Sequence, residues 1–169
     1  MPSAPHTIHG TLERSVELAV PPSRVFATLS ELELRRRWFR IPGDDADGIH
    51  ELDFRVGGTE LVSGSFTAFD RTEVLEFRVR FVDIVVDRRV ISTFEFRLDD
   101  RLRALFVQTF ELNPVEHDDT IATRLDYTDH YTFIDPPGDG AADVAERQGS
   151  ALLMLIGIKV VAEGSADSA

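Results

Sequence analysis

The fold is decided by residues 73–112, which read EVLEFRVRFVDIVVDRRVISTFEFRLDDRLRALFVQTFEL. From Leu75 to Phe81, apolar side chains alternate with charged ones. Such alternation indicates a β-strand that has one face covered and the other in water. Asp87-Arg88 and residues 99–101 interrupt the pattern with polar residues that are typical of turns. The stretch therefore predicts three antiparallel strands joined by short hairpins.

The same alternation extends to both sides of this stretch and predicts seven strands in total. Their expected ranges are 11–20, 49–56, 59–69, 73–86, 89–98, 102–112 and 120–133. Gly57-Gly58 is expected to form the turn between the second and third strands, because tight hairpin turns need positive φ. Asn113-Pro114 is expected to open a longer loop that runs through Asp119. Since short hairpins make most of the connections, we expect one antiparallel meander.

Two short helices are expected between the first and second strands. Pro21-Pro22 stop the first strand and can open a helix, since the first helical amides have no partner within the helix. Ser30 is a candidate N-cap for the second helix, with Glu33 completing a capping box three residues later. Leu34 and Trp38 would then lie on the buried side of this second helix.

A long helix is predicted over residues 141–162 by apolar residues that recur every three to four positions. This spacing places Leu152 and Leu155 on a common face, which we expect to pack against the sheet. The second half of the helix is apolar almost all round, so we expect it to be buried on more than one side. Gly149 and Gly157 weaken a helix, and glycine at such positions usually permits the close approach of another backbone.

The composition fits one globular domain and argues against several classes of partner. The chain has 169 residues, 18 of them Lys or Arg and 30 Asp or Glu, and its net charge of −12 would repel nucleic acid and anionic membranes. It has no cysteine, which excludes disulfides, thiol nucleophiles and thiolate metal sites. No apolar run approaches the roughly 20 residues of a membrane span and no signal peptide is visible, so we expect a cytoplasmic protein. We expect a single domain over residues 11–163, between flexible ends at 1–10 and 164–169.

The opening of the chain, residues 13–40, resembles that of the START-like (SRPBCC) superfamily, in the branch homologous to activators of the heat-shock chaperone ATPase. The resemblance is carried by Arg14, Pro21-Pro22, Val25-Phe26 and Trp38-Phe39, and further along by residues 53–58 and 123–125. It implies the α+β helix-grip fold, in which a curved antiparallel sheet of six to seven strands wraps around a long C-terminal helix. Two short helices follow the first strand in that fold, and a cavity lies between the sheet and the long helix.

The motifs of several common chemistries are absent from the sequence. The five histidines show neither the i,i+4 helical spacing nor the alternate strand spacing of metal ligands, so we expect no metal site. The acidic loop at Asp44, Asp45 and Asp47 lacks the closing Glu of a calcium loop, and a solvated turn is the favoured interpretation. No nucleophile elbow and no phosphate loop is present, so we expect no cofactor.

The last two strands carry the most interesting polar residues. Tyr127 and Asp129 share a strand face with Leu125, so Asp129 is a carboxylate among aromatic rings if that face is covered. Burial would then raise its pKa and suit it to acid or base catalysis. The alternative is that Asp129 lies at the mouth of the cavity and is solvated. Gln108 shares an apolar face with Phe106, and a buried amide must find a hydrogen-bond partner.

We expect one internal cavity that accepts a small apolar or aromatic ligand. The residues expected to border it are Trp38, Phe106, Gln108, Tyr127, Asp129, Leu152 and Leu155. Two other functions that the resemblance implies stay open: a cyclase, aromatase or hydrolase that uses the same cavity, and a co-chaperone that stimulates an ATPase through its surface. No catalytic residue set is evident. A second copy of the chain is a further candidate partner, through the hairpin strands of residues 73–98.

Overall fold

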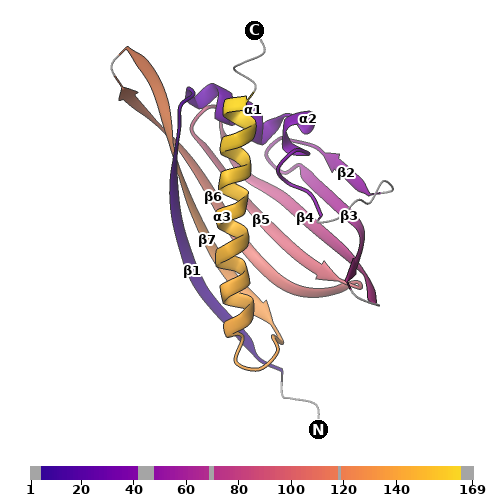
Figure 1. Cartoon of the computed structure of the whole chain (residues 1–169). Helices are drawn as coiled ribbons and strands as arrows, with labels where there is room; N and C mark the ends of the chain where they lie inside the picture. Colours follow the sequence, from indigo (N-terminus) through magenta and orange to yellow (C-terminus); the bar gives the residue numbers. More distant parts are fainter. Residues whose placement is uncertain (1–4, 42–47, 69–70, 118, 165–169) are drawn as a thin grey trace.

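In a computed structural model of the chain, one curved antiparallel sheet holds three helices on its concave side (Figure 1). The structure describes residues 5–41, 48–68, 71–117 and 119–164. The strands are β1 (Thr7–Leu18), β2 (Ile49–Leu52), β3 (Thr59–Ala68), β4 (Arg71–Val85), β5 (Arg89–Leu98), β6 (Arg101–His117) and β7 (Thr120–Ile134). The helices are α1 (Pro22–Ser30), α2 (Leu32–Arg35) and α3 (Ala141–Gly164).

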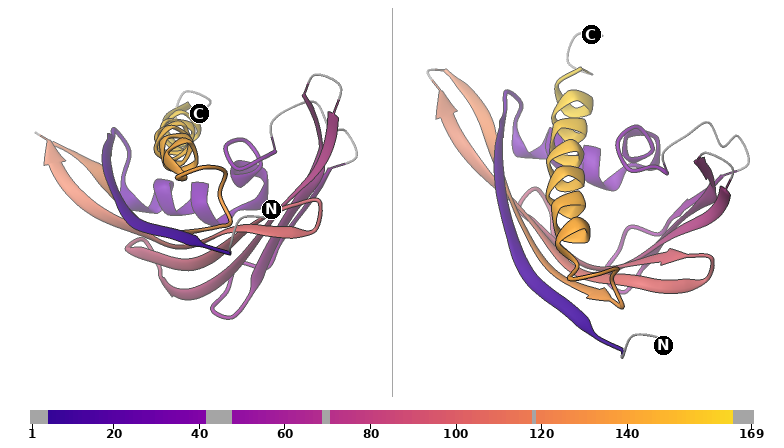
Figure 2. Two further views of the ribbon diagram at one scale, coloured as in Figure 1. Left: turned by 90° about the horizontal axis from the view of Figure 1, so that it is seen from below. Right: turned by 60° about the horizontal axis from the view of Figure 1, so that its bottom comes forward.

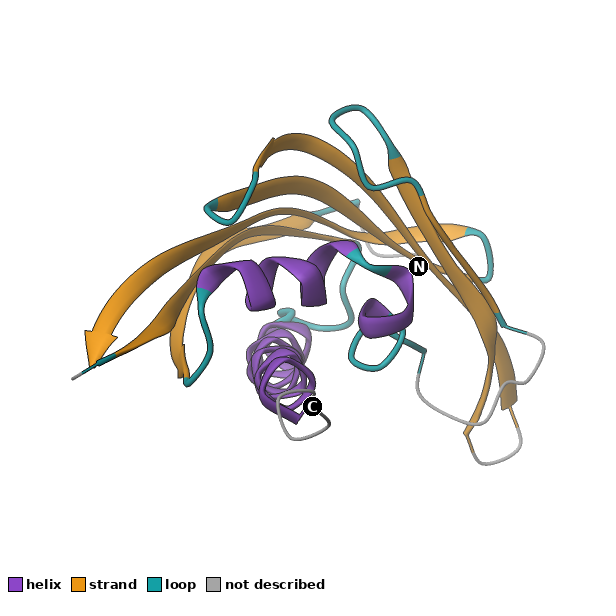
Figure 3. Ribbon diagram, turned by 90° about the horizontal axis from the view of Figure 1, so that it is seen from above, coloured by secondary structure: helices purple, strands orange, loops and turns teal. Residues whose placement is uncertain are grey.

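The strand order is β1-β7-β6-β5-β4-β3-β2, and each neighbouring pair is antiparallel. Strands β2 to β7 therefore form a meander, and β1 adds to β7 at one edge. Seen along the long helix, the sheet arches over α1 and α3 (Figure 3). This arrangement confirms the predicted α+β helix-grip fold.

Two strands extend several residues beyond an end that the sequence predicts. β6 continues through Pro114 to His117, so the loop expected over 113–119 is wrong. Beyond Glu111, β6 has lost β5 as a neighbour and pairs with β7 alone, and such an edge position tolerates the missing N–H of proline. β1 begins at Thr7, which pairs with Ile134, so the expected flexible start is part of the sheet from Thr7 onward. The expected flexible residues 1–4 and 165–169 lie outside the described residues, as does the acidic loop of Asp44, Asp45 and Asp47.

The two short helices follow β1 as the sequence predicts, but the second begins differently and ends at Arg35, so the expectation that Trp38 lies on its buried side is wrong. α1 opens at Pro22, one residue after its N-cap Pro21, as expected from the proline pair. Ser30 is the last residue of α1 rather than the N-cap of α2, because the Glu31 N–H still donates to the Ala27 carbonyl at 2.9 Å. Glu31 is the N-cap of α2 and makes no side-chain cap, so the predicted capping box is wrong.

α3 lies against the sheet with one stripe only. The buried positions of the stripe follow helical spacing and are Ala151, Leu155, Ile158, Val161 and Ala162. The opposite side of α3 is exposed although it is apolar, at Leu152, Leu153, Ile156 and Val160. The expectation that Leu152 shares the buried face of Leu155 is therefore wrong, and so is burial of the helix on several sides. In Figure 2 the helix runs near the β1 edge, and no other described element covers its outer side.

The two glycines inside α3 have different surroundings. A Cβ at Gly157 would lie 3.1 Å from the Cβ of Trp38, so this glycine does permit a close approach. A Cβ at Gly149 would meet nothing within 4 Å, so the same expectation is wrong there. Among the described residues, no helix has the length and apolar character needed to cross a bilayer.

Candidate functional site

The pairing of β6 with β7 brings four of the predicted site residues together on the concave face. Gln108 lies directly opposite Asp129, and Tyr127 lies one pair further along the same face. Phe106 occupies the next inward position of β6. Asp129 is 0% exposed and Gln108 is 7% exposed, so the solvated alternative for Asp129 is wrong.

An arginine from α3 completes this group, which we call the Asp129 cluster (Gln108, Tyr127, Asp129 and Arg147). Arg147 donates from Nε to Asp129 Oδ2 at 2.6 Å and from Nη2 to the Tyr127 hydroxyl oxygen at 2.6 Å. Gln108 donates from Nε2 to the same hydroxyl oxygen at 2.8 Å. The cluster therefore ties the first turns of α3 to the middle of the sheet.

Arg147 is also packed against aromatic rings. Its guanidinium carbon lies 4.3 Å from the ring centroid of Phe106 and 6.0 Å from that of Phe94. Its side chain is only 10% exposed. Arg147 was not among the predicted site residues, although it lies four residues before Ala151 and hence on the buried stripe of α3. A buried carboxylate on the facing strand was the signal that a cation was needed there.

The electrostatics of the cluster leave one oxygen atom unsatisfied. Burial raises the pKa of Asp129 above its ordinary value, and the charge and hydrogen bond of Arg147, together with hydrogen bonding to Tyr127, offset only part of that rise. Burial also raises the pKa of Tyr127, so its hydroxyl is neutral at physiological pH. Asp129 Oδ1 is buried and has no hydrogen-bond partner among the residues that the structure describes. An unpaired buried acceptor of this kind costs about 1–3 kcal/mol.

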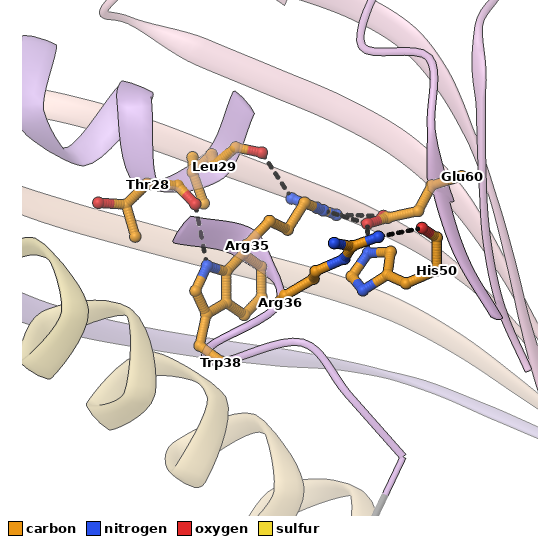
Figure 4. A network of polar contacts seen from close by, with 7 residues as sticks. All are labelled: Thr28, Leu29, Arg35, Arg36, Trp38, His50 and Glu60. Atoms are coloured by element: carbon orange, nitrogen blue, oxygen red, sulfur yellow. Dashed lines mark hydrogen bonds and ion pairs between the residues drawn. The ribbon is translucent and has the colours of Figure 1, made fainter. Parts of the chain in front are cut away.

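A second buried polar group, the Glu60 cluster (Arg35, His50 and Glu60), lies between α2 and strands β2 and β3 (Figure 4). Arg35 donates from Nε to Glu60 Oε1 at 2.5 Å and from Nη2 to Oε2 at 2.7 Å. His50 Nε2 lies 2.8 Å from Oε1. Burial alone would raise the pKa of Glu60, but the charge of Arg35 and the hydrogen bonds from His50 and Arg35 hold it below its ordinary value. Both carboxylate oxygens are satisfied, so this cluster fastens α2 to the sheet.

Trp38 lies beside the Glu60 cluster and not in the Asp129 cluster. Its indole Nε1 donates to the Thr28 carbonyl at 2.9 Å, and the Arg35 guanidinium carbon lies 4.9 Å from its ring centroid (Figure 4). A series of ring contacts joins the two clusters. The centroid distances are 5.7 Å for Trp38–Phe39, 5.9 Å for Phe39–Phe94 and 5.1 Å for Phe94–Phe106.

Several rings around this series are only partly buried. The half-buried aromatic residues that pack on the core from the concave side include Phe39, Phe77, Phe96 and Tyr131. Leu155 lies at the buried centre of α3, whereas Leu152 is 51% exposed on its outer side and takes no part in the group. The arrangement offers half-buried apolar surface beside a buried carboxylate, which suits an apolar molecule with one polar group.

The fold matches solved structures over nearly its whole length. A protein from Rhizobium leguminosarum has a TM-score of 0.78 at 24% identity and covers 95% of this chain and 99% of its own. The Mll3558 protein from Rhizobium loti has a TM-score of 0.69 at 29% identity, covering 90% of this chain and 99% of its own. Norcoclaurine synthase from Thalictrum flavum, in complex with dopamine and hydroxybenzaldehyde, has a TM-score of 0.62 at 12% identity, covering 96% and 90%. The search of curated proteins found no match.

The sequence itself matches a family model over residues 19–140, well over half of the chain. This segment begins at the end of β1 and ends just before α3, so it contains both short helices and the whole meander. The chain therefore belongs to the family described as Activator of Hsp90 ATPase homolog 1-like protein, within the START-like superfamily.

Proposed function

We propose that the protein binds a small apolar or aromatic molecule on the concave side of the sheet, between strands β4 to β7 and α3. The observation that carries the proposal is the Asp129 cluster, a buried charged group packed on the buried rings of Phe94 and Phe106, from which ring contacts continue to the half-buried Phe39 and Phe77. A purely structural core has no need of such a group, since apolar residues of similar volume are often as stable as a buried ion pair.

Two further points support the proposal. Covering the half-buried rings of Phe77 and Phe96 would stabilise a complex by about 25 cal/mol per Å² of apolar surface, less the cost of immobilising the ligand. Norcoclaurine synthase, which shares the fold, carries small aromatic molecules in its structure. The same fold can therefore hold molecules of this class.

Catalysis on a bound aromatic molecule is the second candidate function. Asp129 is the observation that favours it, because a buried carboxyl whose pKa is raised, next to the hydroxyl of Tyr127, is a suitable general acid or base. A cyclase or hydrolase activity would require the same site as binding. Binding is therefore the first property to test.

The neutral dye N-phenyl-1-naphthylamine tests the proposal, because it absorbs where tryptophan emits. Trp38 is the sole tryptophan and stands at one end of the ring series, so saturable dye binding should quench its emission. Phe96→Ala should weaken binding at least about threefold by removing apolar contact surface. Leu105→Ala is the matched control, since Leu105 is partly exposed on the opposite face of neighbouring β6 and should leave the dye affinity unchanged.

Circular dichroism of each variant would establish that it is folded. Absence of saturable binding to the folded wild-type protein would contradict the proposal. Equal loss of affinity in Phe96→Ala and Leu105→Ala would place the dye somewhere other than the concave side.

A further inference from the structure

We infer that the ligand is an uncharged molecule whose hydroxyl or N–H group donates a hydrogen bond to Oδ1 of Asp129. This inference rests on the proposed function and specifies the chemical class of the ligand. It is based on a difference between the two carboxylate oxygens of Asp129: one accepts a hydrogen bond from the protein and the other does not.

The first step concerns hydrogen bonding. Oδ2 of Asp129 receives the Nε–H of Arg147 at 2.6 Å, and hydrogen bonding with the Tyr127 hydroxyl also favours the charged carboxylate, while Oδ1 itself is buried without a partner in the described part of the chain. Glu60 provides the contrast within the same molecule, because Arg35 and His50 occupy both of its oxygens. An ionised carboxylate only accepts hydrogen bonds, so the group that satisfies Oδ1 must be a donor.

The second step concerns the net charge of the Asp129 cluster. The negative charge of Asp129 neutralises the positive charge of Arg147, and the other two members, Gln108 and Tyr127, are neutral. A ligand carboxylate buried there would have no uncompensated cation to face, and a ligand ammonium would lie beside Arg147. Burial of an unpaired charge is costly, so the site favours an uncharged donor.

Three naphthalenes that differ in one group provide the test: 2-naphthol donates, 2-methoxynaphthalene only accepts, and 2-naphthoate is anionic at pH 7. Their affinities for the wild-type protein can be compared by displacement of N-phenyl-1-naphthylamine. We expect 2-naphthol to bind at least about tenfold more tightly than 2-methoxynaphthalene, as is typical of a hydrogen bond to a charged acceptor. We expect 2-naphthoate to bind more weakly than 2-naphthol.

A substitution of Asp129, the proposed hydrogen-bond acceptor, should change the order of affinities among the three naphthalenes. Asp129→Asn leaves the charge of Arg147 uncompensated, so 2-naphthoate should gain affinity relative to 2-naphthol. Asp126→Asn is the matched control, because Asp126 lies on the same strand with its side chain on the opposite face, bonded to Ser15, Asn113 and Arg124. It should preserve the wild-type order. If Asp129→Asn does not fold, the comparison of the three naphthalenes on the wild-type protein decides by itself.

Equal binding of 2-naphthol and 2-methoxynaphthalene to the wild-type protein would overturn the inference while leaving the proposed function in place. A wild-type preference for 2-naphthoate would overturn it as well. If neither the dye nor any of the three naphthalenes binds, the proposed function fails and the inference fails with it.

Discussion

Glu60 and Asp129 are both buried carboxylates on the concave side of the sheet, yet their pKa values move in opposite directions. Glu60 receives hydrogen bonds at both oxygens, which favour its charged form. Asp129 is stabilised in its charged form by Arg147 and Tyr127, but its Oδ1 has no partner in the described part of the chain and the cost of burial is the larger effect. The contribution of Glu60 to stability is therefore lost as pH falls, whereas that of Asp129 is lost as pH rises through its folded pKa.

Glu60→Gln should destabilise the protein by about 3–5 kcal/mol at pH 7, because it leaves Arg35 as an unpaired buried charge. The pKa of Glu60 is below its ordinary value of 4.5, so wild-type stability should fall when the pH drops below that value. Urea unfolding at pH 7 and at pH 3 should show the difference between wild type and Glu60→Gln narrowing at the lower pH. Glu33→Gln, at a side chain that is 84% exposed, is the control, and a difference that stays constant with pH would contradict this account.

The strand residues that face the concave side, the carboxylate of Asp129 included, could be predicted from the sequence, but the two buried arginines could not. Alternation along β6 and β7 identified Phe106, Gln108, Tyr127 and Asp129, because a strand has only two faces. Arg35 and Arg147 are charged, and charged residues are normally assigned to solvent. Their burial depends on Glu60 and Asp129 respectively, which lie on strands distant in the sequence.

At the scale of the element, α3 shows how helical periodicity is misread when a helix is apolar all round. Leu152 and Leu155 are both leucines near the centre of the helix, yet Leu152 is 51% exposed and Leu155 is 2% exposed. The apolar pattern alone could not show which of the two is buried, because each lies three or four residues from other apolar residues of the helix. The position of Arg147 on the stripe fixes which series faces the sheet.

Leu155→Asp should cost about 4 kcal/mol or more, because the new carboxylate would be buried without a cation. Leu152→Asp should change the free energy of unfolding by less than about 0.5 kcal/mol, as is usual for exposed positions. Chemical denaturation of both variants measures the two values. Similar decreases in the free energy of unfolding for the two substitutions would mean that the outer side of α3 is covered in solution.

The two glycines of α3 provide a second matched pair. Gly149→Ala should stabilise the protein by about 0.5–1 kcal/mol, since alanine is the better helix former and the site is open. Gly157→Ala should bring no such gain, because the added methyl group would press on the Cβ of Trp38 at 3.1 Å. Thermal unfolding followed by circular dichroism compares them. An equal gain at both positions would show that α3 does not approach Trp38 so closely.

At the scale of the whole molecule, the order of elements and the antiparallel meander could be predicted from the sequence, because hairpin turns join strands that are neighbours in the chain. The ends of the strands could not be predicted, because a strand continues only as far as an adjacent strand remains available to pair with it. Proline is typical of loops, yet Pro114 lies in β6, in the part of that strand that pairs with β7 alone. Thr7 reads as part of a tail, yet pairing with Ile134 draws it into the sheet.

The position of β1 at the edge of the sheet bears on how the molecule avoids aggregation. An open strand edge is a template on which another chain can add, and β1 pairs with β7 on one side only. Lys159, the one lysine in the sequence, reaches from α3 to the Glu17 carbonyl at 2.7 Å, and Glu163 accepts the Ala19 N–H at 2.8 Å. The helix thus occupies backbone groups at the C-terminal end of β1 that an invading strand would need. The same side chains that dock α3 therefore protect one end of this edge against intermolecular strand addition.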